Sequence, residues 1–346
     1  MKNMQRSLLV FENAIKSKAT RQTYIYHLQR FLDHYKIKDY DGLLKIADSK
    51  LQIMVEDYLF FLKRKVSPNS IPSIFAGIEL FLSINDKILN FKKIHKMYPQ
   101  KNKKSGSRGW TTTEVQKVLR QATKPRSVAL VLFLSSTGCR IGALSGLELR
   151  HIVEMPHGCK AVQLYEEEME EYWSFLTPEA STSLDTYLQR RREDGEVLNP
   201  KSPVFRDSYR IGSAKVKPMT SGAGKTLITR LIKNAKVERL KHGNRHDAQI
   251  VHAFRKRFGT ILKINQNISY STTEALLGHK SGLDATYYKP EMRTQLFEEF
   301  RKAIPDLAVD DSERLDQQNK IKDETIKKIE SDLVLGFRSG RIMNNC

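Results

Sequence analysis

Apolar residues recur at helical spacing along the first hundred residues of the chain. Leu28 and Phe31 share one helical face, and a second apolar face runs over residues 51–62. A third apolar stretch, residues 70–85, is also typical of a helix. The pattern predicts a small, all-helical domain over residues 1–98.

The apolar pattern changes after residue 110 and indicates a second domain of mixed structure. Thr111 and Glu114 have the spacing of a capping box ahead of an apolar helical face. Residues 127–147 are apolar enough for a buried helix, which we expect to break at Gly138. The fold predicted for the whole chain is mainly α with a small antiparallel β-sheet (α+β).

Three short strands account for the predicted sheet. They are expected at residues 151–155, 160–166 and 172–179, and an acidic turn at 166–171 joins the last two. Helical patterns follow over 179–192, 222–236, 246–265, 271–278 and 291–303. We expect these elements to form one domain over residues 111–304.

The chain changes character again after Pro305. Residues 305–346 are charged, and Ile326, Ile329 and Leu333 fall on one potential helical stripe. Such a segment buries little apolar surface by itself, so it either packs on a partner or stays mobile. We therefore treat it as a charged C-terminal tail.

The charge of the chain indicates a polyanionic partner. Its 346 residues include 59 Lys and Arg against 39 Asp and Glu, a formal net charge of +20. Residues 1–110 hold 21 of the basic residues and only 9 of the acidic ones, so the N-terminal third has the stronger positive field. Nucleic acid is the leading candidate partner, and a merely soluble basic protein is the alternative.

A basic linker is predicted over residues 99–110. The stretch "PQKNKKSGSRG" combines Pro, Gly, Ser and basic residues and contains nothing apolar. We expect it to run along a phosphate backbone through Lys101, Lys103, Lys104 and Arg108. An ordinary solvated tether is an equal alternative.

The composition argues against several other classes of protein. Cys139, Cys159 and Cys346 have no metal-ligand spacing and are too few for a disulfide framework, so we expect no metal and a reducing cytoplasm. No segment has the length needed to span a bilayer, and a membrane partner is not expected. "SGAGKT" resembles a phosphate-binding loop, but Met219 stands where that motif requires Gly, so no nucleotide cofactor is expected.

Several residues of the second domain carry side chains suited to phosphate chemistry. Cutting a DNA strand without metal requires a nucleophile, a proton acceptor, cations for the phosphate oxygens and a proton donor for the leaving oxygen. Arg140 follows the buried helix, where its guanidinium can bind phosphate through two hydrogen bonds. His252 and Arg255 lie on one helical face, and His279 follows a plausible helix C-cap at Gly278. Taken singly, each has an ordinary structural explanation.

The order of these residues along the chain is more specific than any one of them. An Arg after a buried helix is followed by a His-x-x-Arg, and then by "LLGHKSGLDATYYKP", in which a Tyr stands nine residues beyond the His. This constellation resembles the tyrosine recombinase (phage-type integrase) family. The segments "GLDATYYKP" and "FLTPEA" are similar to those of the archaeal integrase branch.

The resemblance implies roles for the phosphate-binding residues. Arg140 and Arg255 would clamp the phosphate. His252 would accept a proton and later return it, and His279 would donate a hydrogen bond to the phosphate.

The resemblance also implies a nucleophile and exposes one departure from the family. Tyr288 would be the nucleophile, with Tyr287 as its packing neighbour. The family places a lysine, which protonates the leaving 5′-oxygen, in the turn between two strands, but residues 165–175 read "YEEEMEEYWSF" without a lysine. Lys160, at the start of the preceding strand, is the nearest candidate.

The function implied by the resemblance is site-specific recombination of duplex DNA through a 3′-phosphotyrosyl intermediate, without metal, ATP or other cofactor. Residues 1–98 would be a core-binding domain that closes a clamp with the catalytic domain, and the tail would be exchanged between protomers of a tetramer at synapsis. A mobile genetic element would be its source and the nucleoid its location. Two alternatives stay open: a relative that binds DNA but no longer cuts it, and a type IB topoisomerase-like enzyme.

Overall fold

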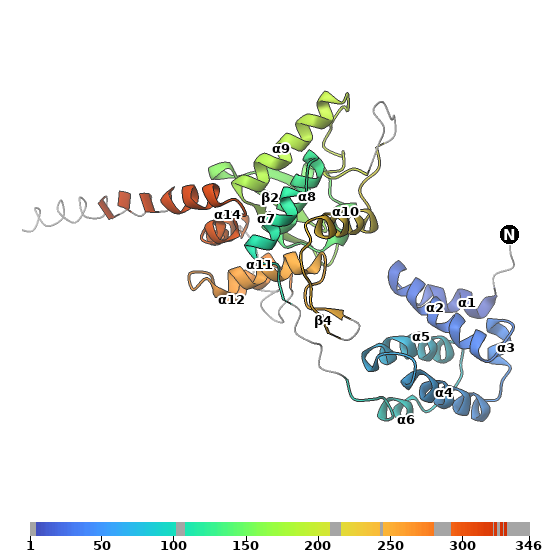
Figure 1. The fold of residues 1–346 in the computed structure, drawn as a ribbon. Coiled ribbons are helices and arrows are strands. Elements are labelled where there is room, and N and C mark those ends of the chain that lie inside the picture. Colours follow the sequence, from blue (N-terminus) through green and yellow to red (C-terminus); the bar gives the residue numbers. More distant parts are fainter. Residues whose placement is uncertain are drawn as a thin grey trace, which may run out of the picture. The chain divides into compact units, whose positions relative to one another are not determined.

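The computed structural model describes residues 5–101, 108–207, 216–242, 245–279 and 292–320, together with six residues between 322 and 330. The chain forms two compact units, Met1–Lys104 and Ser105–Cys346, and each has its own hydrophobic core. Helices dominate both units, and the second also contains a small antiparallel sheet (Figure 1). The predicted mainly helical α+β fold class is confirmed.

The first unit is an all-helical bundle around an aromatic core. Phe11, Phe31, Phe75 and Phe81 are fully buried, and the rings of Phe11 and Phe81 meet edge to face at 5.4 Å between centroids. Its helices are α1 (Arg6–Asn13), α2 (Lys18–His34), α3 (Tyr40–Leu44), α4 (Asp48–Lys63), α5 (Ile71–Ile84) and α6 (Phe91–Lys96). Helix α5 matches the apolar stretch predicted at 70–85.

The second unit is organised around the buried helix α8. This helix packs against α9 and α11 (Figure 1), and its residues from Ala129 to Thr137 are all buried. The helices of the unit are α7 (Thr112–Arg120), α8 (Pro125–Thr137), α9 (Pro178–Glu193), α10 (Ser221–Asn234), α11 (His252–Ile264), α12 (Tyr270–Leu276), α14 (Met292–Arg301) and α15 (Ile304–Leu307).

The start of α7 and the end of α8 lie where the sequence predicts them. Thr111 accepts a hydrogen bond from the Glu114 backbone and Glu114 accepts one from the Thr111 backbone, which is the predicted capping box of α7. Gly138 ends α8 with φ +56°, a left-handed conformation that favours glycine. A Cβ at this position would lie 2.7 Å from the Phe258 side chain. The chain can therefore turn tightly against α11 before it enters the short helix η2 (Ile141–Ser145).

The sheet has the antiparallel order β1-β2-β3, from β1 (Ile152–Glu154), β2 (Lys160–Leu164) and β3 (Tyr172–Leu176). Its register pairs Lys160 with Leu176 at one end of the β2–β3 hairpin and Leu164 with Tyr172 at the other. The acidic turn follows Leu164. Lys160 and the turn therefore lie at opposite ends of the hairpin.

The helix predicted over 246–265 begins later than expected. A short hairpin, β4 (Lys241–His242) and β5 (Arg245–His246), precedes it, and α11 starts only at His252. Asp247 keeps the intervening chain out of the helix, because its backbone and carboxylate bond to Arg108 and to Ala248.

The first residues of the predicted tail, which begins at residue 305, pack in the second unit. Ile304, Leu307 and Val309 are buried in the second unit. The carboxylate of Glu179 accepts the backbone N–H groups of Val309 at 2.9 Å and of Asp310 at 3.1 Å. The exposed helix begins only at residue 311.

The apolar stripe predicted for the tail lies partly in the described residues. Ile326 and Ile329 are 53% and 54% exposed, and Leu333 lies outside the described residues. Among the helices that the structure describes, none is both long and apolar enough to cross a membrane.

Gly138→Ala is expected to lower the free energy of unfolding of the second unit by about 2 kcal/mol, because a left-handed residue with a Cβ costs roughly 1–2 kcal/mol. The contact with Phe258 adds to this cost. Urea denaturation followed by tryptophan fluorescence measures it selectively, since both tryptophans, Trp110 and Trp173, belong to the second unit.

Gly146→Ala is the matched control. Gly146 has φ −104°, and a Cβ there would have no atom within 4 Å. We expect a change within about 0.5 kcal/mol for this exposed position. Equal losses from the two substitutions would show that the left-handed turn after α8 is not under the constraint described above.

Candidate active site

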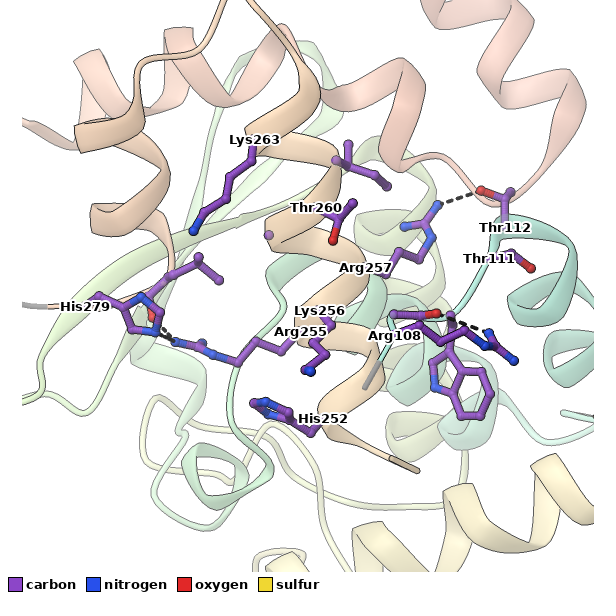
Figure 2. Close-up of a pocket in the computed structure, with 15 residues that line it drawn as sticks. Arg108, Thr111, Thr112, His252, Arg255, Lys256, Arg257, Thr260, Lys263 and His279 are labelled. Carbon is purple, nitrogen blue, oxygen red and sulfur yellow. Dashed lines mark hydrogen bonds between the residues drawn. The ribbon is translucent and has the colours of Figure 1, made fainter. Parts of the chain in front are cut away.

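Arg255 lies at the centre of the candidate site. It occupies the first turn of α11, and only 5% of the residue is exposed. Its guanidinium donates hydrogen bonds to the carbonyl oxygen of Gly138 at 3.1 Å and to that of Leu277. A third contact, 3.0 Å long, joins it to Nε2 of His279 (Figure 2). One side chain thus ties the ends of α8 and α12 to α11.

His279 is held from both sides of its ring. Nδ1 lies 2.7 Å from the carboxylate of Glu274. Arginine has only donors, so Nε2 accepts from Arg255 and the ring proton resides on Nδ1, where it is donated to Glu274. The left-handed Gly278, φ +61°, makes this arrangement possible, because a Cβ there would overlap the ring of Tyr172.

Glu274 links His279 to a lysine on the neighbouring helix. Burial favours the neutral carboxyl, but hydrogen bonds from Lys263, at 2.9 Å, and from His279 outweigh it, and the pKa of Glu274 is lowered. The carboxylate is therefore ionised at neutral pH. Sequence reasoning missed this residue, although a carboxylate five positions before His279 was a readable signal.

His252 begins α11, one turn before Lys256 on the same helix, and its side chain is exposed. Burial of part of the ring, followed by the positive charges of Lys256, Arg255 and Arg140, lowers the pKa of His252 below its ordinary value of 6.5. At neutral pH the imidazole is therefore uncharged and can accept a proton.

Arg140 approaches the same group of residues from the end of α8. It is exposed and immediately precedes η2. Its positive charge is one of the causes that lower the pKa of His252. The structure therefore groups His252, Arg255 and His279 around one groove, with Arg140 in the segment that follows α8.

A groove of about 810 Å³ runs along this side of α11 (Figure 2). Its basic lining side chains include His252, Arg255, Lys256, Lys263 and His279. This concentration of positive charge suits a phosphate group. In the parts of the chain that the structure describes, no cluster of His, Cys, Asp or Glu is arranged to hold a metal ion.

Lys160 is not part of this cluster. Its ammonium group bonds to the carboxylate of Glu154 and lies 3.1 Å from that of Asp185, and its side chain is 7% exposed. It also lies at the end of the β2–β3 hairpin opposite the acidic turn. Lys160 therefore belongs to a local ion-pair network, and it is not among the residues that line the basic groove.

The acidic turn is less repulsive toward a phosphate than its sequence indicates. Glu166 binds Arg150 at 2.5 Å and His151 at 2.9 Å. Glu171 accepts hydrogen bonds from the Gln163 side chain at 2.7 Å and from a backbone N–H of the turn at 3.0 Å. Two of the five glutamates are therefore bound within the turn and its neighbouring segments.

In the structure the guanidinium of Arg108 is held by two carboxylates. Its two terminal nitrogens donate to Glu114 at 2.7 and 2.8 Å, and Nε donates to Asp247 at 2.8 Å. This residue anchors the entry to α7 and the loop before α11. Lys101 is exposed.

The remaining predicted residues, Lys103, Lys104, Tyr287 and Tyr288, lie outside the described residues.

The sequence and the fold were compared with known proteins. The family model of the phage integrase family matches residues 110–292, which is more than half of the chain. The tyrosine recombinase XerC of Treponema denticola is 27% identical over 185 residues, or 52% of this chain and 56% of that protein. The match therefore spans little more than half the length of this relative.

Solved structures share the fold at low sequence identity. The XerH site-specific recombinase bound to its difH substrate, a pre-cleavage complex, has a TM-score of 0.54 and 18% identity, covering 81% of this chain and 80% of that one. The Tn1549 transposon integrase in complex with transposon right end DNA has a TM-score of 0.53 and 13% identity, covering 86% and 99%. The family match, over a segment that contains Arg140, His252, Arg255 and His279, shows that the chain belongs to the phage integrase family.

Proposed function

We propose that this protein is a site-specific DNA recombinase that cleaves and rejoins duplex DNA through a 3′-phosphotyrosyl intermediate, without metal or ATP. The observation that carries the proposal is that His252, Arg255 and His279 line one basic groove along α11, while the charge of Arg140 acts on His252. Family membership supports it. The XerH and Tn1549 integrase structures, which share the fold, contain DNA, and this supports duplex DNA as the partner.

Arg140 and Arg255 are proposed to hold the scissile phosphate. A phosphate oxygen that enters between Arg255 and His279 accepts the Arg255 hydrogen bond that Nε2 of His279 now accepts. His279 donates to this oxygen once Nε2 has gained a proton. Glu274 stays bonded to Nδ1 of His279 and keeps the ring in place. Fixed cations of this kind stabilise the charge that develops on a pentacoordinate phosphorane.

Tyr288 is the proposed nucleophile, and His252 is the proposed acceptor of its proton. The phenolic oxygen forms a bond to phosphorus while the bond from phosphorus to the 5′-oxygen breaks. The lowered pKa of His252 supports this role, because a neutral imidazole is the form that accepts a proton. Attack by another 5′-hydroxyl on the phosphotyrosyl ester reverses the step and joins new strands.

The finer biological assignment is also a proposal. The first unit, rich in lysine, is proposed to bind DNA together with Lys101, Lys103 and Lys104. Four protomers are proposed to assemble at synapsis, with the tail exchanged between them. The sequence near Tyr288 supports the archaeal integrase branch. A mobile genetic element is the proposed source and the nucleoid the proposed place of action.

Tyr288→Phe is expected to reduce covalent adduct formation by more than about 10³-fold, because the variant lacks the attacking oxygen. DNA affinity should stay nearly unchanged. The measurement uses nicked, labelled DNA that carries the target site, with chelator and without ATP, followed by denaturing gels. Tyr287→Phe is the matched control and should cleave normally; the reverse pattern would move the nucleophile by one residue.

Lys160→Ala is expected to cleave DNA within about tenfold of the wild-type rate, since its ammonium group is bound by Glu154 and Asp185. Removal of a true general acid costs about 10²–10⁴-fold in rate. Single-turnover cleavage of the same nicked DNA separates the two results. A loss in the larger range would identify Lys160 as the proton donor despite its place in the structure.

The His252 ring should titrate with a midpoint below pH 6.5 in the free protein. The acceptor form is the neutral one, so cleavage at subsaturating protein should fall as the pH drops through this lowered pKa and should not fall between pH 7 and 6.5. An NMR titration of the histidine ring signals, assigned with His252→Gln, gives the midpoint. A midpoint above pH 6.5 would contradict the positive surroundings described for this ring.

A further inference from the structure

The acidic turn leaves one catalytic requirement open. An alkoxide leaves phosphorus slowly unless it is protonated, and residues 165–175 contain no lysine to supply the proton. Tyr165 is the first residue after β2 and opens this turn. Its φ of +59° is rare for a bulky residue, and such conformations collect at functional sites.

The Tyr165 hydroxyl lies beside the segment that follows Arg140. A Cβ built on Gly142, two residues after Arg140, would lie 3.6 Å from the Tyr165 hydroxyl. The charges of Arg140 and Arg255 both act on this phenol. The ring is half-buried against the core, and within the described ranges its hydroxyl makes no hydrogen bond.

The turn directs the Tyr165 side chain and the Glu166 carboxylate to different neighbours. Glu166, the next residue, points to Arg150 and His151, so the backbone presents the phenol and the first carboxylate to different neighbours. The left-handed conformation at Tyr165 produces this reversal. The hydroxyl is therefore available to a ligand that is bound by Arg140 and Arg255.

We propose that the Tyr165 hydroxyl protonates the 5′-oxygen that leaves phosphorus, in the place of the missing lysine. The inference rests on the proposed recombinase function. When Tyr288 attacks, its proton passes to His252, and the Tyr165 proton passes to the departing 5′-oxygen. In the rejoining step the Tyr165 phenolate takes the proton of the incoming 5′-hydroxyl, so the site returns to its starting state.

The chemistry of a phenol suits this exchange. A phenol, with an ordinary pKa of about 10, is nearly as strong an acid as a lysine ammonium group, with about 10.4. Burial, followed by the nearby Cys139, raises the pKa of Tyr165 more than Arg140 lowers it, so the hydroxyl carries its proton at neutral pH. After the transfer, Arg140 and Arg255 stabilise the phenolate.

Three other groups are rivals for the role. Lys160 lies at the wrong end of the hairpin, bound to two carboxylates. The Tyr172 hydroxyl, across the hairpin, is buried from solvent and hence from a DNA strand. Lys256 lines the groove, but it lies on α11 with His252 and Arg255, on the side proposed to accept the nucleophile's proton.

The test compares two DNA substrates that differ in one atom. In the second, sulfur replaces the bridging 5′-oxygen of the scissile phosphate. A thiolate, the base of an acid with a pKa of about 8.5, leaves without a proton. Tyr165→Phe should cleave the oxygen substrate about 10²–10⁴-fold more slowly than wild type. On the sulfur substrate it should cleave at nearly the wild-type rate.

Each outcome decides the assignment. A normal rate for Tyr165→Phe on the oxygen substrate, or an equal loss on both substrates, would overturn it. So would a sulfur-specific rescue of Lys256→Ala or Tyr172→Phe in its place. Tyr165→Lys is the second variant, which restores a donor at this position and should exceed Tyr165→Phe on the oxygen substrate. If wild-type protein forms no adduct with either substrate, the recombinase function itself fails.

Discussion

Three hydrogen bonds from one buried guanidinium hold the site in shape. Arg255 reaches the carbonyl oxygens of Gly138 and Leu277 and the ring of His279, which belong to segments far apart in the sequence. A buried cation without partners is costly, so these bonds are strongly favoured once α11 is packed. The left-handed glycines that follow α8 and α12 let both chain ends approach this one side chain. Packing of the second unit and preparation of the phosphate site are therefore the same event.

The positive field of the arginines acts on two neutral proton carriers. Burial of part of the ring, followed by the charges of Lys256, Arg255 and Arg140, lowers the pKa of His252, which keeps the imidazole free to accept a proton. Burial raises the pKa of Tyr165, which keeps its phenol able to donate one. At neutral pH the imidazole is therefore unprotonated and the phenol protonated. Two groups in these states can act as base and acid at the same pH. Glu274 adds a single ionised carboxylate that fixes His279 without entering the basic groove directly.

Much of the fold could be predicted because its signals are local. Helical periodicity, the Thr111 capping box and the break at Gly138 depend on neighbours in the sequence, and the order of Arg140, His252, Arg255 and His279 indicated a shared site. Features that depend on partners distant in the sequence could not be predicted. In the sequence Arg108 resembles a free linker cation, but in the fold Glu114 and Asp247 bind its guanidinium. The exposed tail begins later than predicted because Glu179 binds the backbone at Val309. In the sequence Tyr165 looks like an ordinary strand residue. Only its backbone conformation and its surroundings in the fold distinguish it from one.

The proposed function requires this basic groove to direct a tyrosine of the "YY" pair onto a DNA phosphate. Trapping the protein on nicked target DNA in the presence of chelator, digesting the adduct and sequencing the modified peptide by mass spectrometry tests it most directly. The account predicts a nucleotide joined through its 3′-phosphate to Tyr288. A nucleotide on another residue, a 5′-phosphate linkage, or tight binding with no covalent product would contradict it.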